Sequence, residues 1–224
     1  MNPFSKDIDI ILSKINKDNL SINIMEELYR IKDRLIKMWE RGLIKSNHSV
    51  MEFVISYFLL KNGYWVEVEY FLEDSLICDI YAVKDNRSLI VEVETGFVPP
   101  TNAVDPVMYR YSREISKIVR YSQYCDEFAL ATPPYHILYI PNIFIRPRNM
   151  RSIDEALKLK EVLDKYYRKP SIEIDRILNA KINYVYIVYV DMVDVIVIDV
   201  NKYIANINQN FLEKIAGERR FPLS

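Results

Sequence analysis

The stretch SLIVEVETGFVPP, residues 88–100, decides the fold because it has the pattern of a strand that ends in charge and then turns. Apolar residues alternate with Glu92 and Glu94, and the chain then leaves the strand at Gly96 and turns at Pro99–Pro100. Side chains two positions apart in a strand point to the same face, so both carboxylates share one face of a largely apolar strand. Carboxylates crowded on such a face repel one another and lose hydration, and a divalent cation beside them would offset both penalties.

Two further strands are expected directly before this one, at YWVEVEYFL (64–72) and SLICDIYAV (75–83). Their connections are short and polar, which predicts an antiparallel meander. Asp79 lies as far before the second connection as Glu92 lies after it, so a simple register places the two acids across from each other. Mg²⁺ or Mn²⁺ held by these acids and by the backbone carbonyl of Val93 is the expected occupant.

The remaining pattern predicts an α/β domain with a mixed sheet. The strand at 128–132 follows a helical crossover, so a parallel pairing places it in the same sheet as the meander. Hydrophobic periodicity predicts these other elements, in chain order: a helix at 24–44 with Gly42 as its C-cap, and helices at 49–61, 107–124 and 153–168, followed by β-rich runs at 183–190 and 193–199. We expect an N-terminal helical extension (1–48), a core (49–135) and a C-terminal helix-plus-hairpin extension (136–224) packed on the core.

Composition restricts the class of protein. The chain has 224 residues, and its 30 Lys and Arg nearly balance its 31 Asp and Glu, which argues against a strongly basic nucleic-acid coat. Cys78 and Cys125 are too few for a disulfide framework or a four-ligand zinc site, and His48 and His136 are interpreted as structural or surface residues. Charges interrupt the apolar N-terminus, and no run reaches the roughly 20 apolar residues of a membrane helix. A cytoplasmic protein without a membrane segment is expected, and without a Gly-rich phosphate loop no nucleotide cofactor is expected.

The order of elements and three of the acids resemble the PD-(D/E)xK nuclease superfamily. Its core carries an acid on the first helix, Asp on the second strand and Glu-x-Lys on the third; here SVMEFVIS offers Glu52, ICDIYAV offers Asp79 and IVEVET offers Glu92. The spacing from Glu52 to Gly63 is similar to archaeal Holliday-junction resolvases, and VEVETGFVPP to nuclease-like proteins of crenarchaea and their spindle-shaped viruses. The likeness covers residues 49–132. It implies a restriction-endonuclease-like core and a Mg²⁺- or Mn²⁺-dependent endonuclease that cuts DNA, including branched DNA such as Holliday junctions, in the host cytoplasm if the chain is viral.

One position departs from the family pattern. Glu94 stands where the family has lysine, and a carboxylate cannot stabilise negative charge on a phosphate. Some members of the family take the lysine from the following helix, where Lys117 is the nearest candidate. Helical geometry at about 100° per residue directs Lys117 away from the core face, so Glu114 and Gln123 are possible substitutes. Glu94 could instead help to bind a second metal or orient water, or catalysis has been lost.

Basic residues suggest where nucleic acid would bind. The helix at 107–124 carries a basic stripe opposite its apolar face, and a second basic cluster lies between prolines in the irregular segment after it. Both suit phosphate contacts, and both would also be ordinary solvated surface. The predicted nucleic-acid contacts are Arg110, Arg113, Lys117, Arg120, Arg146 and Arg148.

The predicted site residues also have ordinary explanations. Glu52 follows Ser49 by three residues, as in a capping box at a helix N-terminus. Asp79 could be satisfied by backbone or by a basic neighbour, and the acids at 92 and 94 could line a solvated sheet face. Glu67 and Glu69 alternate in the same way in the first strand, so alternating glutamates alone are weak evidence.

Three functions therefore stay open. The first is a metal-dependent DNA endonuclease, with Asp79, Glu92 and Val93 at the metal and Glu52, Glu94 and Lys117 in supporting catalytic roles. The second is a DNA-binding or scaffold protein whose catalytic site has decayed, and the third is a protein-interaction module without nucleic acid. The apolar segment 183–200 is expected to pair with a second copy in a homodimer.

Overall fold

A six-stranded mixed sheet forms the centre of the molecule in the computed structural model, which describes residues 3–16, 20–73, 76–167 and 171–207. The strands lie side by side in chain order. They are β1 (Trp65–Glu73), β2 (Leu76–Lys84), β3 (Arg87–Val93), β4 (Glu127–Thr132), β5 (Tyr184–Tyr189) and β6 (Asp194–Asp199). β1, β2 and β3 form the predicted antiparallel meander, and β4 joins β3 in parallel as expected. The prediction of an α/β domain with a mixed sheet is therefore confirmed.

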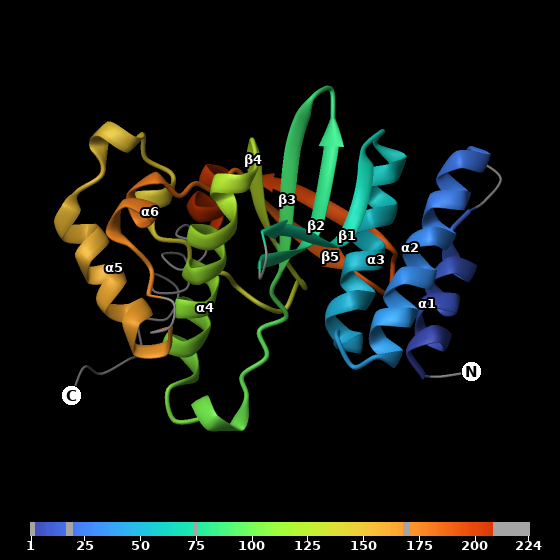
Figure 1. The fold of residues 1–224 in the computed structure, drawn as a ribbon, viewed down its shortest axis with the longest axis horizontal. Helices are drawn as coiled ribbons and strands as arrows, with labels where there is room; N and C mark the ends of the chain where they lie inside the picture. The colour runs from blue at the N-terminus through green and yellow to red at the C-terminus, as the bar shows by residue number, and fades with distance from the viewer. Residues whose placement is uncertain (1–2, 17–19, 74–75, 168–170, 208–224) are drawn as a thin grey trace, which may run out of the picture.

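Helices cover both faces of the sheet and make three layers (Figure 1). On one face lie α1 (Pro3–Lys14), α2 (Ile22–Glu40) and α3 (Ser46–Lys61), and on the other lie α4 (Pro106–Tyr121), α5 (Ile153–Tyr166) and α6 (Ile174–Asn179). Short 3₁₀ turns lie at Pro100–Asn102, Ser122–Tyr124, Asn142–Phe144 and Arg148–Met150. The irregular segment predicted between β4 and α5 is confirmed.

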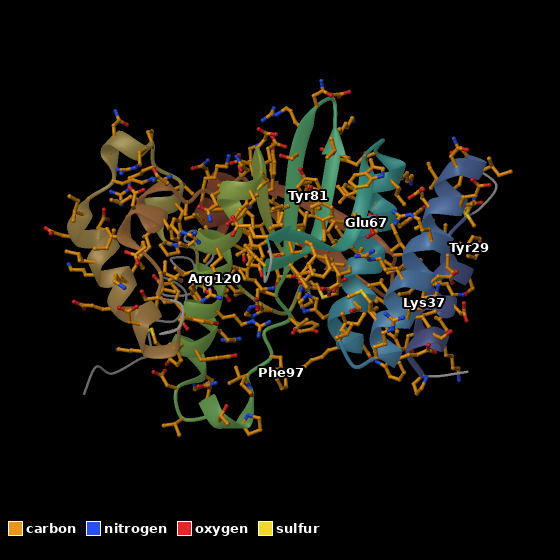
Figure 2. The ribbon with its side chains drawn as sticks, in the orientation of Figure 1. Tyr29, Lys37, Glu67, Tyr81, Phe97 and Arg120 are labelled. Carbon is orange, nitrogen blue, oxygen red and sulfur yellow. The ribbon has the colours of Figure 1, made fainter. Side chains whose placement is uncertain are left out.

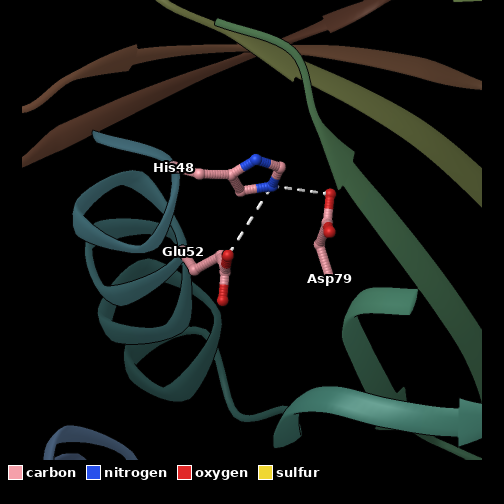
Figure 3. Close-up of side chains that lie close together, drawn as sticks. All are labelled: His48, Glu52 and Asp79. Carbon is pink, nitrogen blue, oxygen red and sulfur yellow. Dashed lines mark ion pairs between the residues drawn. The ribbon is translucent and has the colours of Figure 1, made fainter. Parts of the chain in front are cut away.

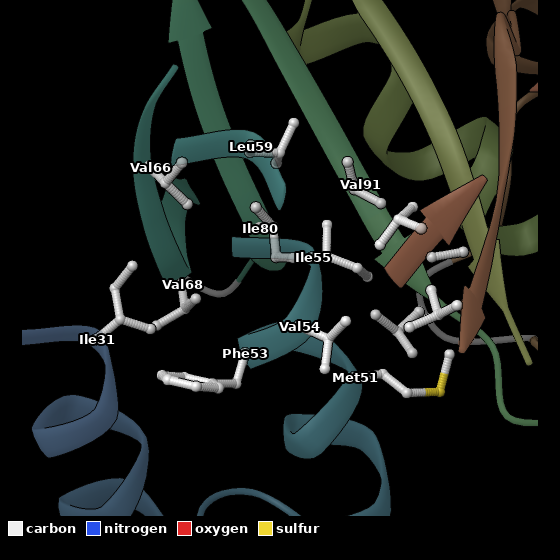
Figure 4. Packing of buried hydrophobic residues seen from close by; sticks show 14 of the residues in the cluster. Ile31, Met51, Phe53, Val54, Ile55, Leu59, Val66, Val68, Ile80 and Val91 are labelled. Atoms are coloured by element: carbon white, nitrogen blue, oxygen red, sulfur yellow. The ribbon is translucent and has the colours of Figure 1, made fainter. Parts of the chain in front are cut away.

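The alternation of β3 divides its side chains between two cores. Leu89, Val91 and Val93 pack toward α1, α2 and α3, where Figure 4 shows Val91 near residues of α3. Ile90 packs on the opposite face, under α4. Glu92 follows in the same alternation as Ile90, so it faces the α4 layer.

Two helix boundaries test the predicted caps. Gly42 follows α2 with a φ of +70°, and the Leu43 N–H donates to the Met38 carbonyl at 3.0 Å, so the predicted C-cap is confirmed. The capping box at Ser49 is wrong, because α3 begins at Ser46 with Lys45 as its N-cap. Glu52 is therefore inside the helix, where it cannot serve as the capping residue of the first turn.

The helices α1 and α6 lie outside the predicted elements. α1 buries Phe4, Ile8 and Ile11 at helical spacing, although the charges between them hid this pattern. α6 has only 6 residues, which is too short for a periodicity to be visible. Among the described residues no helix is long and apolar enough to cross a membrane.

The β-rich segment near the C-terminus belongs to the same sheet. β5 pairs in parallel with β4, and β6 pairs with β5, so this hairpin extends the central sheet of its own chain and only β6 remains at the edge. The apolar run predicts a dimer interface because hydrophobic strands near a terminus often seal dimers, but its first strand, β5, instead pairs with β4 of the same chain. The predicted C-terminal extension is described only as far as residue 207, and Asp74, Ser75 and residue 168 also lie outside the described residues.

The two edges of the sheet differ. At the β1 edge, Arg30 Nη2 donates to the Val66 carbonyl at 2.8 Å, and Arg34 Nη2 donates to the Glu69 carbonyl at 2.9 Å. Both arginines also pair with Glu67, labelled in Figure 2, at 2.7 and 3.1 Å. Side chains of α2 thus satisfy edge carbonyls of β1, as expected for a protected edge strand. β6 forms the opposite edge.

Candidate metal centre

The site forms where β2 separates from β3. Backbone pairing between these strands runs from the turn to the pair Ile80–Val91 and ends there. Beyond it, Glu92 Oε1 accepts the Asp79 N–H at 3.0 Å, and Asp79 Oδ2 accepts the Val93 N–H at 2.6 Å. Side-chain carboxylates thus replace the ladder between the backbones, and the predicted apposition of Asp79 and Glu92 is confirmed.

A change of face in β1 and β2 accompanies this opening. Val68 and Ile80 belong to the core under α3, whereas Tyr70 and Cys78, two positions along each strand, belong to the core under α4. Glu69 lies between Val68 and Tyr70 with a φ of +48°, a left-handed conformation that is rare for a residue other than glycine. The regular alternation of side chains between the two faces therefore breaks between Val68 and Tyr70 in β1 and between Cys78 and Ile80 in β2. Side chains from both helical layers can meet there.

His48, Glu52 and Asp79 meet on the α3 side of the opening (Figure 3). His48 Nε2 lies 2.9 Å from Asp79 Oδ2 and 3.6 Å from Glu52 Oε1. His48 and Glu52 are four residues apart in α3, so one helix face presents both to the strand. One ligand atom from each of the three residues lies within 4.8 Å of the others, which is compact enough for one metal ion.

Glu52 provides an independent sign that this cluster is built for a ligand. Its side chain is completely buried, with 0% exposure. Oε1 has Ser49 Oγ at 3.5 Å, whereas Oε2 is buried and has no hydrogen-bond partner among the described residues. A buried carboxylate oxygen without a partner is costly, and a cation bound by this carboxylate through Oε1, the oxygen 3.6 Å from His48 Nε2, would offset part of that cost. The residues present therefore fit a divalent metal ion.

Lys117 enters the opening from the α4 side. Its ammonium lies 3.0 Å from Asp79 Oδ2, 3.1 Å from Glu92 Oε2 and 3.2 Å from Glu94 Oε1, and it donates to the Val93 carbonyl at 2.8 Å. Burial lowers the pKa of Lys117, but these acids outweigh burial and raise it well above its ordinary value. The expectation that Lys117 points away from the site is wrong. The helix was divided correctly into apolar and basic faces, but its basic face meets the end of β3 rather than water.

Burial and mutual repulsion control ionisation in the cluster. Burial first, and the charge of Asp79 second, raise the pKa of both Glu52 and Glu92. Burial also acts on Asp79 and raises its pKa, but the contacts with His48 and Lys117 outweigh burial and lower the pKa of Asp79. Asp79 is thus the carboxylate that stays ionised between the two helical layers.

Glu94 and Arg113 close the site on its outer side. Arg113 Nε donates to both carboxylate oxygens of Glu94 at 2.9 Å, and Glu94 is only 3% exposed. Burial lowers the pKa of Arg113, but Glu94 outweighs burial and raises it. A solvated strand face is therefore excluded for this acid, which binds two basic side chains of α4.

Glu69 of β1 continues the row of acids. The pairs that flank it in the β1–β2 register place it across from Asp79, so Glu69, Asp79 and Glu92 form one line across three strands. Burial first, and the charge of Asp79 second, raise the pKa of Glu69 to about 7. In the sequence Glu69 is one of two alternating glutamates in the first strand, and only the register of β1 with β2 identifies it as part of this row.

The other candidate substitutes for the missing lysine are not in the centre. Glu114 is buried against His136, with 3.1 Å between Oε1 and Nε2, and its Oε2 accepts the Tyr139 N–H at 3.1 Å. Arg110 Nη1 lies 3.2 Å from His136 Nδ1. Gln123 is exposed and donates to the Arg120 carbonyl at 3.5 Å. Glu114 and Arg110 instead support the segment after β4, where the structural interpretation of His136 is confirmed.

The remaining predicted nucleic-acid contacts have partners within the chain. Arg120, labelled in Figure 2, lies over the ring of Tyr167 at 5.1 Å. Arg146 pairs with Glu155 at 2.6 Å, and Arg148 donates to Asn179 at 2.8 Å. Arg148 keeps 51% of its side chain exposed. The second cluster is thus separate from the metal centre, and its contact with DNA stays a prediction.

His48 is the residue of the centre that sequence analysis missed. It was read as isolated because no second histidine follows at a metal-binding spacing. The signal was instead His48-x-x-x-Glu52, which places an imidazole and a carboxylate on one helix face. No known protein-family model matches the chain, and neither a curated protein nor a solved structure gives a significant match.

Proposed function

We propose that the chain is a metal-dependent nuclease that hydrolyses phosphodiester bonds in DNA. The observation that carries the proposal is the position of Asp79, which pairs with His48 at 2.9 Å on one side and with Lys117 at 3.0 Å on the other. A site with a possible metal position next to a buried ammonium supports phosphoryl chemistry, because both charges can act on one phosphate. The helix, meander, helix and parallel-strand order of the core supports a restriction-endonuclease-like fold.

Asp79, Glu52 and His48 would hold the ion. Glu92 would position Asp79, because its carboxylate accepts the hydrogen bond of the Asp79 backbone N–H. Bound there, Mg²⁺ or Mn²⁺ would lower the pKa of a coordinated water and neutralise phosphate charge. The imidazole of His48 favours Mn²⁺ relative to Mg²⁺, which prefers oxygen ligands.

Lys117 supplies the charge that Glu94 cannot. Its ammonium is held by the Val93 carbonyl at 2.8 Å and by neighbouring acids. From this position it would hydrogen-bond the attacking water or a phosphate oxygen, and Arg113 on the preceding turn would orient the next phosphate. We propose DNA as the partner and the cytoplasm, of a host cell if the chain is viral, as the location.

The test is cleavage of four-way junction, flap and linear duplex DNA with Mn²⁺ and with Mg²⁺. Asp79→Asn should abolish cleavage. Asp126→Asn is the matched control, because Asp126 binds Ser88 near the start of β3, away from the metal centre. Equal activity of the wild type and Asp79→Asn would reject the nuclease.

One observation favours a second candidate, an inactive DNA-binding or scaffold protein. Lys117 and Arg113 already pair with acids of the site, and His48 lies against Asp79, so the cluster can be stable without an ion. This candidate expects no calorimetric signal for Mn²⁺ and salt-sensitive DNA binding that Asp79→Asn leaves unchanged. Absence of any DNA binding would reject both candidates.

We also propose a homodimer formed through β6. This edge strand carries Ile196 and Val197 with 47% and 38% exposure. Light scattering during size exclusion should give the mass of a dimer, and Val197→Lys should give a monomer. A monomeric wild type at micromolar concentration would reject this interface.

A further inference from the structure

We infer that the ammonium of Lys117 occupies the position of a second divalent cation, so that loss of this side chain's charge creates a further metal site. The inference rests on the proposed function for the first metal position, between α3 and Asp79. Its own evidence is the surroundings of the ammonium on the α4 side of the same aspartate.

The oxygens around Lys117 are those of a metal site. Asp79, Glu92 and the Val93 carbonyl are the ligand set that sequence reasoning predicted for Mg²⁺ or Mn²⁺. The ammonium contacts all three, together with Glu94, at distances between 2.8 and 3.2 Å. Carboxylates plus one backbone carbonyl are the ligands that hard divalent cations select. The oxygens of the predicted ligand set therefore do converge on one point, and the ammonium of Lys117 occupies that point.

An ammonium satisfies this set incompletely. It has three N–H donors, whereas oxygens of four groups lie within 3.2 Å of Nζ. Its single charge also faces three acids, Asp79, Glu92 and Glu94. Among the described residues Arg113 also binds Glu94, and His48 lies 2.9 Å from Asp79. A divalent ion would match both the number of oxygens and their charge better than Lys117 does.

Both cation positions use the same aspartate. His48 and Lys117 lie 2.9 and 3.0 Å from Asp79 Oδ2. In two-metal hydrolytic sites a carboxylate commonly lies between ions about 4 Å apart. Here the position beside His48 would take a metal ion, and the position on the α4 side keeps the ammonium of Lys117. The centre would then hold two cations, of which only one is a metal ion.

The experiment counts Mn²⁺ ions per chain by calorimetry and by electron paramagnetic resonance, without DNA. Lys117→Met keeps the length of the side chain and removes its charge, and it should bind one more Mn²⁺ than the wild type and show magnetic coupling between ions. Lys117→Arg keeps the charge and should match the wild type. Lys181→Met, which removes a lysine bound to the Asp126 carbonyl far from the site, is the matched control.

A second variant separates loss of charge from loss of structure. In Lys117→Ala, added ethylammonium should compete with the additional Mn²⁺ and return the number of Mn²⁺ ions bound per chain to that of the wild type. Lys117→Gln replaces Lys117→Met if circular dichroism shows that the methionine variant does not fold. A folded, uncharged variant with no additional Mn²⁺ overturns the inference. An additional ion without DNA cleavage by the wild type supports it and rejects only the nuclease.

Discussion

Lys117 Nζ lies 3.0 Å from Asp79 Oδ2, although 38 residues separate them in the chain. This contact joins the helix after the meander to the strand at its centre, where backbone pairing between β2 and β3 has ended. The pair therefore holds together a part of the sheet that hydrogen bonds of the ladder do not hold.

We expect Lys117→Met to destabilise the metal-free protein by about 3 kcal/mol, because removal of one partner leaves buried charge uncompensated. Urea unfolding in the presence of EDTA measures this change. Mn²⁺ should restore part of the loss in the variant. Lys181→Met, which removes an ammonium that donates to the carbonyl of exposed Asp126 at 2.8 Å, should change the free energy of unfolding by less than about 0.5 kcal/mol.

Removal of the imidazole should change the choice of metal. His48→Ala should weaken Mn²⁺ binding at least about tenfold, because a nitrogen ligand is lost, and should weaken Mg²⁺ binding less. Calorimetric titration with each ion measures both affinities. His136→Ala is the control, since His136 contacts Glu114 and Arg110 rather than the centre. Equal losses for the two ions would contradict a role of His48 as ligand.

Glu69 should make stability depend on pH near neutrality. Its pKa is raised to about 7 in the folded chain, so the folded state holds this proton more tightly than the unfolded state. Stability from this group is complete below the unfolded pKa of about 4.3 and is lost as pH rises through about 7.

Glu69→Gln should remove this loss. Compared with the wild type in EDTA, the variant should gain about 2 kcal/mol between pH 5 and pH 8, with each pKa unit worth about 1.4 kcal/mol and some screening by solvent. Glu67→Gln, which removes the neighbouring acid bound to α2, is the comparison. Parallel stability curves for Glu69→Gln and the wild type would show that Glu69 does not hold the proton.

Two glycines provide a matched test of packing behind the site. Gly42 and Gly96 have φ values of +70° and +75°, so alanine is strained at both. A Cβ at Gly42 would meet no atom within 4 Å, whereas at Gly96 it would lie 2.9 Å from His136 Nδ1. Gly42→Ala should cost about 1 kcal/mol, and Gly96→Ala about 2 kcal/mol more because of overpacking. Thermal unfolding compares them, and equal losses would contradict the contact with His136.

The sequence allowed the centre of the sheet to be predicted because its information is local. Alternation and short connections defined the meander, and counting from the turn placed Asp79 opposite Glu92, as the observed register confirms. The parallel position of β4 followed from the helical crossover. By contrast, β5 pairs with β4 across the intervening residues 133–183, and no local pattern in the sequence indicates this pairing.

The site was predicted less completely, because its other residues reach it through features of the backbone and of the packing that a sequence pattern does not show. His48 reaches Asp79 only because α3 begins at Ser46, before the predicted start. Glu69 lies in line with Asp79 and Glu92 at a positive φ, which cannot be predicted from a glutamate in the sequence. Lys117 was placed on the correct helix face, but a helical wheel cannot tell whether a polar face meets water or buried acids.

The unequal edges of the sheet have a consequence for assembly. Strand addition at β1 would have to displace Arg30 and Arg34 from backbone carbonyls, whereas β6 has no such arginine pair among the described residues. A chain with only one edge strand open to pairing can form an isologous dimer through that edge, and the dimer then has no open edge for a further copy. Association through this sheet would therefore stop at a closed pair instead of growing into a fibril.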